Sequence, residues 1–361
     1  MFELPDYHAP DWNAEILMQA PDVRMQKAEA DGIVPEDFHS TSMYPEYFKI
    51  QGEWKLAEES RMDCVVLWNG ETLCVTEPRN VKQGDLVILG RKEDGSEGIY
   101  VHADGFIQRQ ANGDVFAFRT RRSRETAFSR DYDRFIDLLR YEKEHGKIVW
   151  VLGPACSFDH DCRRAFRYLI ENGYLHGLMA GNALATHDLE AAHLHTALGQ
   201  DIYTGVSAPL GHYNHLEVIN RVRRCGSIAD FVHAYDLQDG IMASLVHHHI
   251  PFVLGGSIRD DGPLPDVITD TRKAQDAMRN MVRDATTVVC LATQLHTIAT
   301  GNMTPSFRVK DGIVRPLYIY CVDISEFVTN KLFDRGTLSA VSITANVQDF
   351  AVLTAKNLGM K

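Results

Sequence analysis

The second half of this 361-residue chain alternates short apolar runs with amphipathic stretches, and no other feature constrains the fold as strongly. Continuous apolar runs are typical of strands that are buried on both faces of a sheet. The stretches between them have helical spacing, and the clearest are 161–171, 189–198 and 274–283. The alternation predicts a parallel sheet with helices on both faces. The apolar runs are 147–155, 177–183, 247–257, 286–293, 316–324 and 338–347.

The first 120 residues have a different pattern, in which short β-type runs are separated by turn signals such as Asn69-Gly70 and Gly84-Asp85. This spacing predicts a small antiparallel sheet or barrel. We therefore expect a β-rich domain over 1–120 and a Rossmann-like α/β domain over 121–361. The charged segment 119–131 is expected to be a linker or an exposed crossing. The β-type runs are 47–54, 63–68, 71–78, 85–90 and 98–106.

Charge and composition exclude several classes of protein. Lys and Arg number 37 and Asp and Glu number 49, a net charge of −12, which is unsuited to binding nucleic acid or an anionic membrane. The seven cysteines are scattered without a C-x-x-C pair, which favours buried free thiols in a reducing compartment. The acidic amino terminus has no apolar signal region, and no run reaches the length of about 18 apolar residues that a membrane span needs. We expect a cytoplasmic protein.

Small or polar residues end the apolar runs, and these positions are the first candidates for a binding site. Ligands of parallel sheets bind beyond the carboxyl ends of the strands, where small residues allow close approach and helix amino termini attract phosphate. A carboxylate at such an end, as at Asp323, suits the hydroxyls of an adenosine ribose. Any one glycine is better explained by a turn of the chain, but the set together favours a nucleotide crevice. The strand-end residues are Gly153, Pro154, Ala155, Ala180 to Ala183, Gly255, Gly256, Ser257, Ala292, Thr293 and Asp323.

The densest polar segment is 255–270, which directly follows an apolar run. Pro263 and Pro265 stiffen it, because each proline ring restricts φ. Arg259 suits a bidentate contact with a substrate carboxylate, and Asp260, Asp261 and Asp266 offer carboxylates for proton transfer. The alternative is an Arg–Asp network that only braces the loop; we favour the functional interpretation.

Other polar motifs are less specific. His296 follows the run 286–293, so its ring is either a proton shuttle or a structural hydrogen bonder. Asn182 is a candidate hydrogen-bonding group, with His187 and Asp188 further along. No histidine pair has the spacing of a metal site, and 247–249 are expected to end a helix. The chain contains no G-x-G-x-x-G sequence, so the conventional dinucleotide fingerprint is absent. It also contains no Walker A or G-x-S-x-G sequence, which argues against an NTPase or a hydrolase.

Several long motifs resemble one known family. FHSTSMYPEYFKIQGEW, LMAGNALATHDLEAA, GSIRDDGPLPDVITD and LATQLHTIATGNM are similar to segments of the LOR/SDH-type domain of archaeal-type ornithine cyclodeaminases. They also resemble the carboxy-terminal part of the bifunctional arginine dihydrolase/ornithine cyclodeaminase. The resemblance extends from about Phe38 to the end of the chain. It implies a Rossmann-like domain akin to that of deoxyhypusine synthase, with tightly held NAD, and is consistent with the missing fingerprint.

The resemblance implies roles for particular residues. By analogy with the family, cofactor contacts are expected from Asn182, Ala183, Asp261, Thr293, Gln294, Leu295, His296, Asp323 and Ile324. The strand-end argument adds Gly153, Pro154 and Ser257 to the expected cofactor contacts. For catalysis, Arg259 or Arg61 is the expected carboxylate anchor and Asp260 or Asp266 the expected base. The chain departs from the family at 1–33, where members carry a GHLIDS-like motif, and at the insert 307–316.

Three functions follow as hypotheses. The first is an NAD-dependent ornithine cyclodeaminase that converts L-ornithine to proline and ammonia. The second is an NAD-dependent dehydrogenase or lyase acting on another amino acid or an opine-like imine. The third is a non-catalytic NAD-binding metabolite sensor. We expect a homo-oligomer that binds a small amino-acid substrate and neither nucleic acid nor membranes.

Overall fold

The computed structural model describes residues 2–106, 129–260, 262–324 and 339–361. Its largest sheet has seven strands, and every pair of neighbours is parallel, as the apolar runs predict. In spatial order the strands are β14 (Val267–Ile268), β13 (Phe252–Gly255), β10 (Gly177–Gly181), β9 (Ile148–Leu152), β15 (Thr287–Leu291), β18 (Tyr318–Asp323) and β19 (Ala340–Thr344). The predicted α/β fold class with a Rossmann-like sheet is confirmed.

The order of these strands places a topological switch point between β9 and β15. Without the short β14, the chain visits the strands in the spatial order 3-2-1-4-5-6, so the chain runs outward in one direction from β9 and in the other from β15. Parallel strands end at the same edge of the sheet, and ligands of doubly wound sheets bind beyond that edge near the switch point. We call this edge the carboxyl edge.

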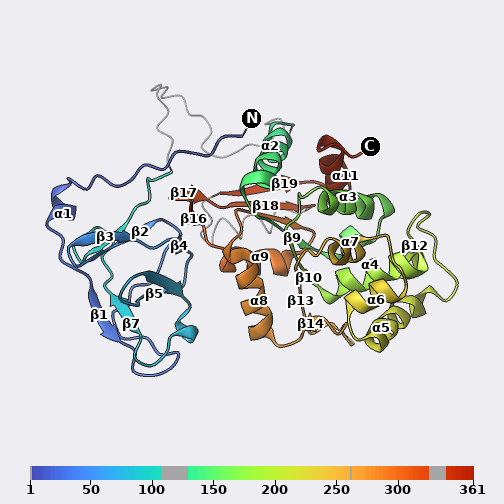
Figure 1. The fold of residues 1–361 in the computed structure, drawn as a ribbon, viewed down its shortest axis with the longest axis horizontal. Coiled ribbons are helices and arrows are strands. Elements are labelled where there is room, and N and C mark those ends of the chain that lie inside the picture. Colours follow the sequence, from blue (N-terminus) through green and yellow to red (C-terminus); the bar gives the residue numbers. More distant parts are fainter. Residues whose placement is uncertain (1, 107–128, 261, 325–338) are drawn as a thin grey trace.

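Helices cover both faces of the sheet (Figure 1). The face that includes Trp150 packs against one set of helices, and the face that includes Val149 and Val151 packs against α8 and α9. The first set is α2 (Ser129–His145), α3 (His160–Glu171), α4 (Asn182–Leu194), α5 (Asn214–Cys225), α6 (Ile228–Ala234), α7 (Ile241–His247) and α11 (Val347–Asn357), and the second is α8 (Thr271–Arg283) and α9 (Gln294–Met303). Short elements between them are η2 (Pro154–Ser157), β11 (Thr196–Ala197), β12 (Gln200–Asp201) and η3 (Gly211–Tyr213).

One helix begins earlier than its sequence pattern indicates. The pattern predicts a helix over 189–198, whereas α4 starts at Asn182, directly after β10, and ends at Leu194. Nearly every residue from Asn182 to Ala191 is buried. A helix without a polar face has no amphipathic periodicity, so the pattern could not locate its start. The prediction for 247–249 holds, since α7 ends there in exposed histidines.

The amino-terminal region forms two antiparallel sheets, which confirms its β-rich character. One has the order β1 (Arg24–Lys27), β7 (Leu86–Leu89), β5 (Val65–Trp68) and β6 (Leu73–Thr76), and the other β3 (Glu53–Leu56), β2 (Glu46–Ile50) and β8 (Ile99–Val101). The run 47–54 is not one strand but the β2–β3 hairpin, whose turn residues Gln51 and Gly52 have φ of 54° and 81°. Short helical segments are α1 (Glu15–Met18) and η1 (Pro78–Asn80).

The insert 307–316 connects the two regions. It forms the hairpin β16 (Phe307–Lys310) and β17 (Ile313–Pro316), and β16 also pairs with β4 (Glu59–Ser60) of the amino-terminal region. The amino terminus makes a second contact between the regions, because Phe2 packs edge-on against Tyr318 of the large sheet. The predicted domain boundary at residue 120 lies outside the described residues. The predicted linker ends earlier than 131, since α2 begins at Ser129.

Two further predictions concern the whole chain. All seven cysteines are free thiols; five are buried, Cys225 is partly buried and Cys74 is exposed. Across the described ranges, the structure contains no helix with both the length and the apolar character of a membrane span.

Candidate active site

Two helices begin at the carboxyl edge without a capping side chain. The N-cap residues are Gly181 for α4 and Thr293 for α9, and neither makes a side-chain capping bond to a described residue. By contrast α3, α8 and α11 are capped by Asp159, Asp270 and Asn346, whose side chains accept bonds from backbone amides. Uncapped amino termini leave N–H donors and the positive end of the helix dipole for an anion. The α4 and α9 termini therefore suit the phosphates of a nucleotide.

Glycines at this edge provide space rather than a turn. Gly153 and Gly181 have φ of −84° and −103°, which any residue can adopt. A Cβ at Gly153 would lie 1.9 Å from the carbonyl oxygen of Ala292, and one at Gly181 would lie 3.1 Å from Cε1 of His296. The simple turn explanation does not apply to these two positions, because the loops after β9, β10 and β15 approach too closely for a side chain.

His296 reaches across this edge from α9 to the end of β10. Burial lowers the pKa of its imidazole, and the nearby carboxylate of Asp260 partly opposes that effect. Asp260 is held in a tight turn, since its Oδ2 accepts a hydrogen bond of 2.8 Å from the amide of Ser257. The fold thus brings together His296, Asp260, Ser257 and Gly181, which lie far apart in the sequence.

Arg259 is exposed beside this group. Its backbone amide donates to Ser257 Oγ at 3.2 Å, while its guanidinium has no acidic partner among the described residues. Three apolar side chains are also exposed beyond the strand ends, namely Ile258, Leu295 and Ile324, and the latter two are 76% and 77% exposed. Exposed apolar side chains near an exposed guanidinium and uncapped helix amides are typical of a surface that a ligand covers.

Two predicted site residues also brace the loop 255–270. Asn182 Oδ1 accepts from the amide of Leu264 at 3.0 Å, and Asp266 Oδ2 accepts from the amide of Ile228 at 2.8 Å. These bonds tie the loop to the first turns of α4 and α6. Asn182 and Asp266 therefore do brace the loop, and their contacts with a ligand remain predictions. Asp261 lies outside the described residues, and Asp323 ends β18 on the other side of the switch point.

Arg61 is not brought together with the other candidates. It is 4% exposed, and its guanidinium pairs with Glu77 at 2.6 Å and with Glu59 at 3.4 Å. Glu77 also lies 2.7 Å from Arg279 of α8, so the network joins the amino-terminal sheets to the body of that helix. A buried guanidinium needs such carboxylates, and the network explains Arg61 without a substrate.

The structure brings together one pair that the sequence motifs did not reveal as a unit. His187 Nδ1 lies 2.9 Å from Glu190 Oε2 on α4, and Glu190 is fully buried. The available signal was spacing: Ala183, His187 and Glu190 recur at i, i+4 and i+7, so they share one face of a helix. That signal was hidden because the pattern did not place this segment in a helix.

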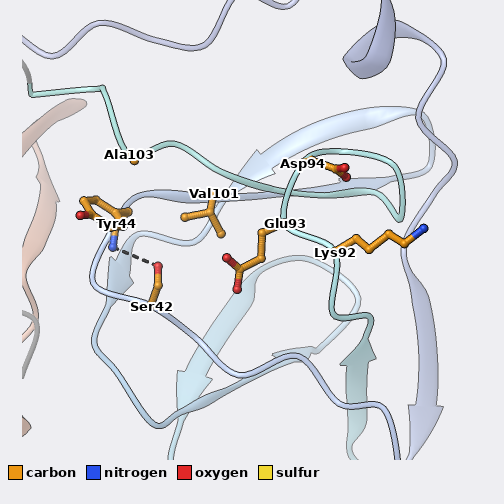
Figure 2. Close-up of a pocket in the computed structure, with 7 residues that line it drawn as sticks. All are labelled: Ser42, Tyr44, Lys92, Glu93, Asp94, Val101 and Ala103. Carbon is orange, nitrogen blue, oxygen red and sulfur yellow. Dashed lines mark hydrogen bonds between the residues drawn. The ribbon is translucent and has the colours of Figure 1, made fainter.

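Two open cavities lie away from this edge. Open cavities of about 470 and 490 Å³ lie in the amino-terminal region. In the first, Glu93 extends toward the space beside Ser42 and Tyr44 (Figure 2). Trp12, Tyr47 and Trp54 line the second. The described residues contain no group of three His, Cys, Asp or Glu side chains that could hold a metal ion.

Known proteins match both the sequence and this fold. Residues 136–354 match the family model described as "Arginine dihydrolase ArgZ-like, C-terminal, Rossmann fold". The chain is also 38% identical over 354 residues to the ornithine cyclodeaminase of Methanopyrus kandleri, covering 95% of this chain and 80% of that protein. This chain belongs to the ornithine cyclodeaminase family. The resemblance drawn from the motifs is thereby confirmed.

Other members of the ornithine cyclodeaminase family extend the comparison. The bifunctional arginine dihydrolase/ornithine cyclodeaminase AgrE of Nostoc sp. is 34% identical over 346 residues, which cover 93% of this chain and 47% of AgrE. A putative LOR/SDH protein from Methanococcus maripaludis has a crystal structure with a TM-score of 0.83 at 35% identity, covering 94% and 98% of the two chains. The ternary complex of AgrE with ornithine and NAD+ has a TM-score of 0.59 at 33% identity, covering 94% of this chain and 46% of AgrE.

Proposed function

We propose that this protein is an NAD-dependent ornithine cyclodeaminase whose active site is the carboxyl edge. The observation that carries the proposal is the convergence at one switch point of two uncapped helix termini, the His296–Asp260 group and the exposed guanidinium of Arg259, which has no acidic partner among the described residues. The helix termini suit the phosphates of a nucleotide, Arg259 suits a carboxylate, and the His296–Asp260 group suits proton transfer. The structure of AgrE with ornithine and NAD+ supports the same pairing of substrate and cofactor.

The residues at this edge fit a dinucleotide. From β13 to β18 there are four interstrand steps, or about 19 Å at the usual strand spacing, which suits an extended dinucleotide lying across the edge. In this arrangement Asp323 binds the adenosine ribose, and the amides at the starts of α4 and α9 bind the phosphates. The loop 255–270 would then hold the nicotinamide. Asp323 would repel the 2′-phosphate of NADP, so we propose that the cofactor is NAD.

The substrate is held by this chain's own side chains. Arg259 binds the α-carboxylate, because its planar guanidinium offers two parallel donors. Bound NAD+ would supply the hydride chemistry, namely removal of a hydride from the α-carbon and its later return to the cyclic imine. Between these steps the δ-amine attacks the α-carbon and ammonia leaves, so one nitrogen must lose a proton and the other must gain one. Asp260 or Asp266 is the proposed proton acceptor near the amines.

The decisive experiment incubates purified protein with NAD+ and L-ornithine and measures proline, ammonia and NADH. A cyclodeaminase forms proline and ammonia in equal amounts without accumulating NADH, because the cofactor is regenerated in each turnover. Accumulation of NADH with an amino acid other than ornithine would favour the dehydrogenase. Binding of NAD without turnover of any amino acid would favour the sensor.

Variants of the loop 255–270 test the proposed roles. Arg259→Lys keeps the charge but loses the bidentate fork, so KM for ornithine should rise roughly 10-fold with NAD affinity unchanged. Arg223→Lys is the matched control, since Arg223 only braces the same loop through a bond of 3.1 Å to the carbonyl of Pro263. An equal rise in KM in both variants would mean that Arg259 braces the loop as well.

A second pair of variants separates the two candidate bases. Asp266→Asn keeps an oxygen for the amide of Ile228 but removes the base, and Asp260→Asn does the same for the amide of Ser257. The variant that lacks the true base should lose roughly 10²-fold in turnover while still binding NAD. Normal turnover in both variants would exclude both carboxylates.

A further inference from the structure

One face of α4 places a histidine beneath the carboxyl edge. Ala183, His187 and Glu190 lie on this face, Ala183 is exposed at the edge, and His187 is 8% exposed one turn below it. Helical side chains lean toward the amino terminus of their helix, so the ring of His187 leans toward the turn of Ala183. The ring also packs against Phe158, which follows η2 after β9, so His187 lies between the segments that leave the ends of β9 and β10.

The hydrogen bonds around Glu190 determine which nitrogen of His187 carries the proton. Asn214 Nδ2 donates to Thr196 Oγ1 at 2.8 Å, so the Thr196 hydroxyl directs its own proton to Glu190 Oε1, also at 2.8 Å. The amide of Gly199 donates to the same oxygen at 3.1 Å. Glu190 is therefore a buried acceptor, and its Oε2 faces Nδ1 of His187 at 2.9 Å. Such a carboxylate places the imidazole proton on Nδ1.

The other ring nitrogen of His187, Nε2, then carries a lone pair that can accept a proton. Nε2 has no hydrogen-bond partner among the described residues, and it is not one of the buried polar atoms sealed without a partner. The ring packs edge-on against Phe158, which follows η2, and lies 6.1 Å from the ring of His215 on α5. An imidazole held at Nδ1 and open at Nε2 is arranged to accept a proton.

A second histidine–glutamate pair in this chain shows the contrasting arrangement. His39 Nε2 lies 2.9 Å from Glu46 in the amino-terminal region, and the two residues are 1% and 0% exposed. Ser42 also donates to Glu46. That pair is sealed in the core of the amino-terminal region. The same chemistry is structural in one region and faces the site in the other.

We propose that His187, oriented by Glu190, transfers the protons of the amino groups in the crevice. It takes a proton from the δ-ammonium of the substrate as that nitrogen becomes the nucleophile, and it gives the proton to the departing α-amino group, which leaves as ammonia. Asp260 or Asp266 accepts the other proton, which the α-ammonium loses before the hydride is removed. No oxidant or co-reactant beyond those of the proposed function is needed. Glu190 is a positioning residue that acts through His187. The inference rests on the proposed ornithine reaction and adds a proton carrier to it.

Glu190→Gln tests the positioning role directly. If the amide oxygen keeps the bonds from Thr196 and Gly199, the amide NH₂ faces Nδ1 and moves the imidazole proton to Nε2. Nitrogen-15 NMR of the ring should show this change of tautomer, and turnover should fall roughly 10²-fold with NAD affinity unchanged. A changed tautomer with normal turnover would overturn the proposal, as would an unchanged tautomer.

His187→Gln provides the second variant, and His39→Gln is its matched control. His187→Gln should lower kcat roughly 10²-fold and leave both KM for ornithine and NAD affinity near wild type. His39→Gln should lower the thermal midpoint and leave kcat unchanged. If the wild-type protein converts ornithine and His187→Gln does so at the same rate, only this inference is overturned. If the wild-type protein does not convert ornithine, the proposed function is overturned and this inference with it.

Discussion

Glycine has different roles in the two regions of this molecule. In the amino-terminal sheets, Gly52, Gly70 and Gly84 have φ of 81°, 103° and 92°, and a Cβ on any of them would meet nothing within 4 Å. At the carboxyl edge, Gly153 and Gly181 have ordinary negative φ, but a Cβ at Gly153 would overlap a backbone oxygen and one at Gly181 would press tightly against His296. The first group is required by backbone conformation and the second by close packing of loops around the candidate site. Substitutions in the first group should therefore affect stability alone, whereas substitutions in the second should affect both stability and binding.

Gly153→Ala should have the largest effect. Its Cβ would lie 1.9 Å from a backbone oxygen of the neighbouring loop, which cannot rotate away as a side chain would. We expect a loss of about 3 kcal/mol in the free energy of unfolding, together with loss of NAD binding. Urea denaturation and calorimetry would measure both.

Gly84→Ala is the control for this prediction. It introduces only left-handed strain, so it should cost about 1–2 kcal/mol and leave NAD affinity unchanged. The contrast between the two regions would fail if Gly153→Ala were no more disruptive than Gly84→Ala.

Glu77→Gln tests the connection between the regions. Burial by itself would raise the pKa of Glu77, but the charges of Arg61 and Arg279 and the hydrogen bond from Arg61 outweigh it and lower the pKa. Removing this carboxylate takes the shortest ion pairs, at 2.6 and 2.7 Å, from Arg61 and Arg279 and leaves each with one longer pair, so we expect a loss of about 2 kcal/mol in the free energy of unfolding. Because the pKa is lowered by folding, this contribution is present above the unfolded value near 4.5 and disappears as the pH falls through the folded value. Glu53→Gln, which removes an exposed partner of Lys55 at 3.6 Å, should change stability by less than about 0.5 kcal/mol.

Asn182→Ala should have a smaller effect that is confined to binding. The amide oxygen holds Leu264 of the loop 255–270, and the same residue starts α4 at the proposed phosphate site. Loss of one such bond should weaken NAD affinity by about 1 kcal/mol while the fold stays intact. Thr186→Val removes the other donor to the same oxygen, at 3.3 Å, and serves as the control. Unchanged NAD affinity in Asn182→Ala would assign this side chain to bracing alone.

The smallest predicted effect is a dependence of stability on pH that arises in the parallel-sheet region. Burial lowers the pKa values of His176, His193 and His296, and nearby Lys147 and Arg221 add to the effect at the first two. The unfolded chain then binds more protons than the folded chain just below the unfolded value near 6.5, so stability should fall as the pH falls through about 6.5. Urea denaturation at about pH 7.5 and about pH 5.5 would measure this difference. His176→Gln should reduce it, whereas substitution of the exposed His248 should not.

Local pattern was sufficient for much of the fold. Buried strands such as Ile148–Leu152 are continuous apolar runs, and α8 has a clear amphipathic face, so both were predictable. The start of α4 was not predictable, because a helix that is buried all round has no periodicity to detect. The function of the insert 307–316 as a strand pair for β4 was equally hidden, since strand pairing is a contact between distant segments.

The sequence alone determined the fold class, the family and the strand ends at which a ligand would bind, because apolar periodicity and long motifs are local properties. Only the tertiary structure decided which polar residues meet. Arg259 remains open at the carboxyl edge, while Arg61, equally promising as a free cation, is neutralised by Glu77 between two regions. Likewise His187 and His39 both pair with glutamates, yet one lies beneath the candidate site and the other in a sealed core. The physical reason is that the availability of a charge or lone pair depends on burial and on partners, and segments far apart in the chain supply both.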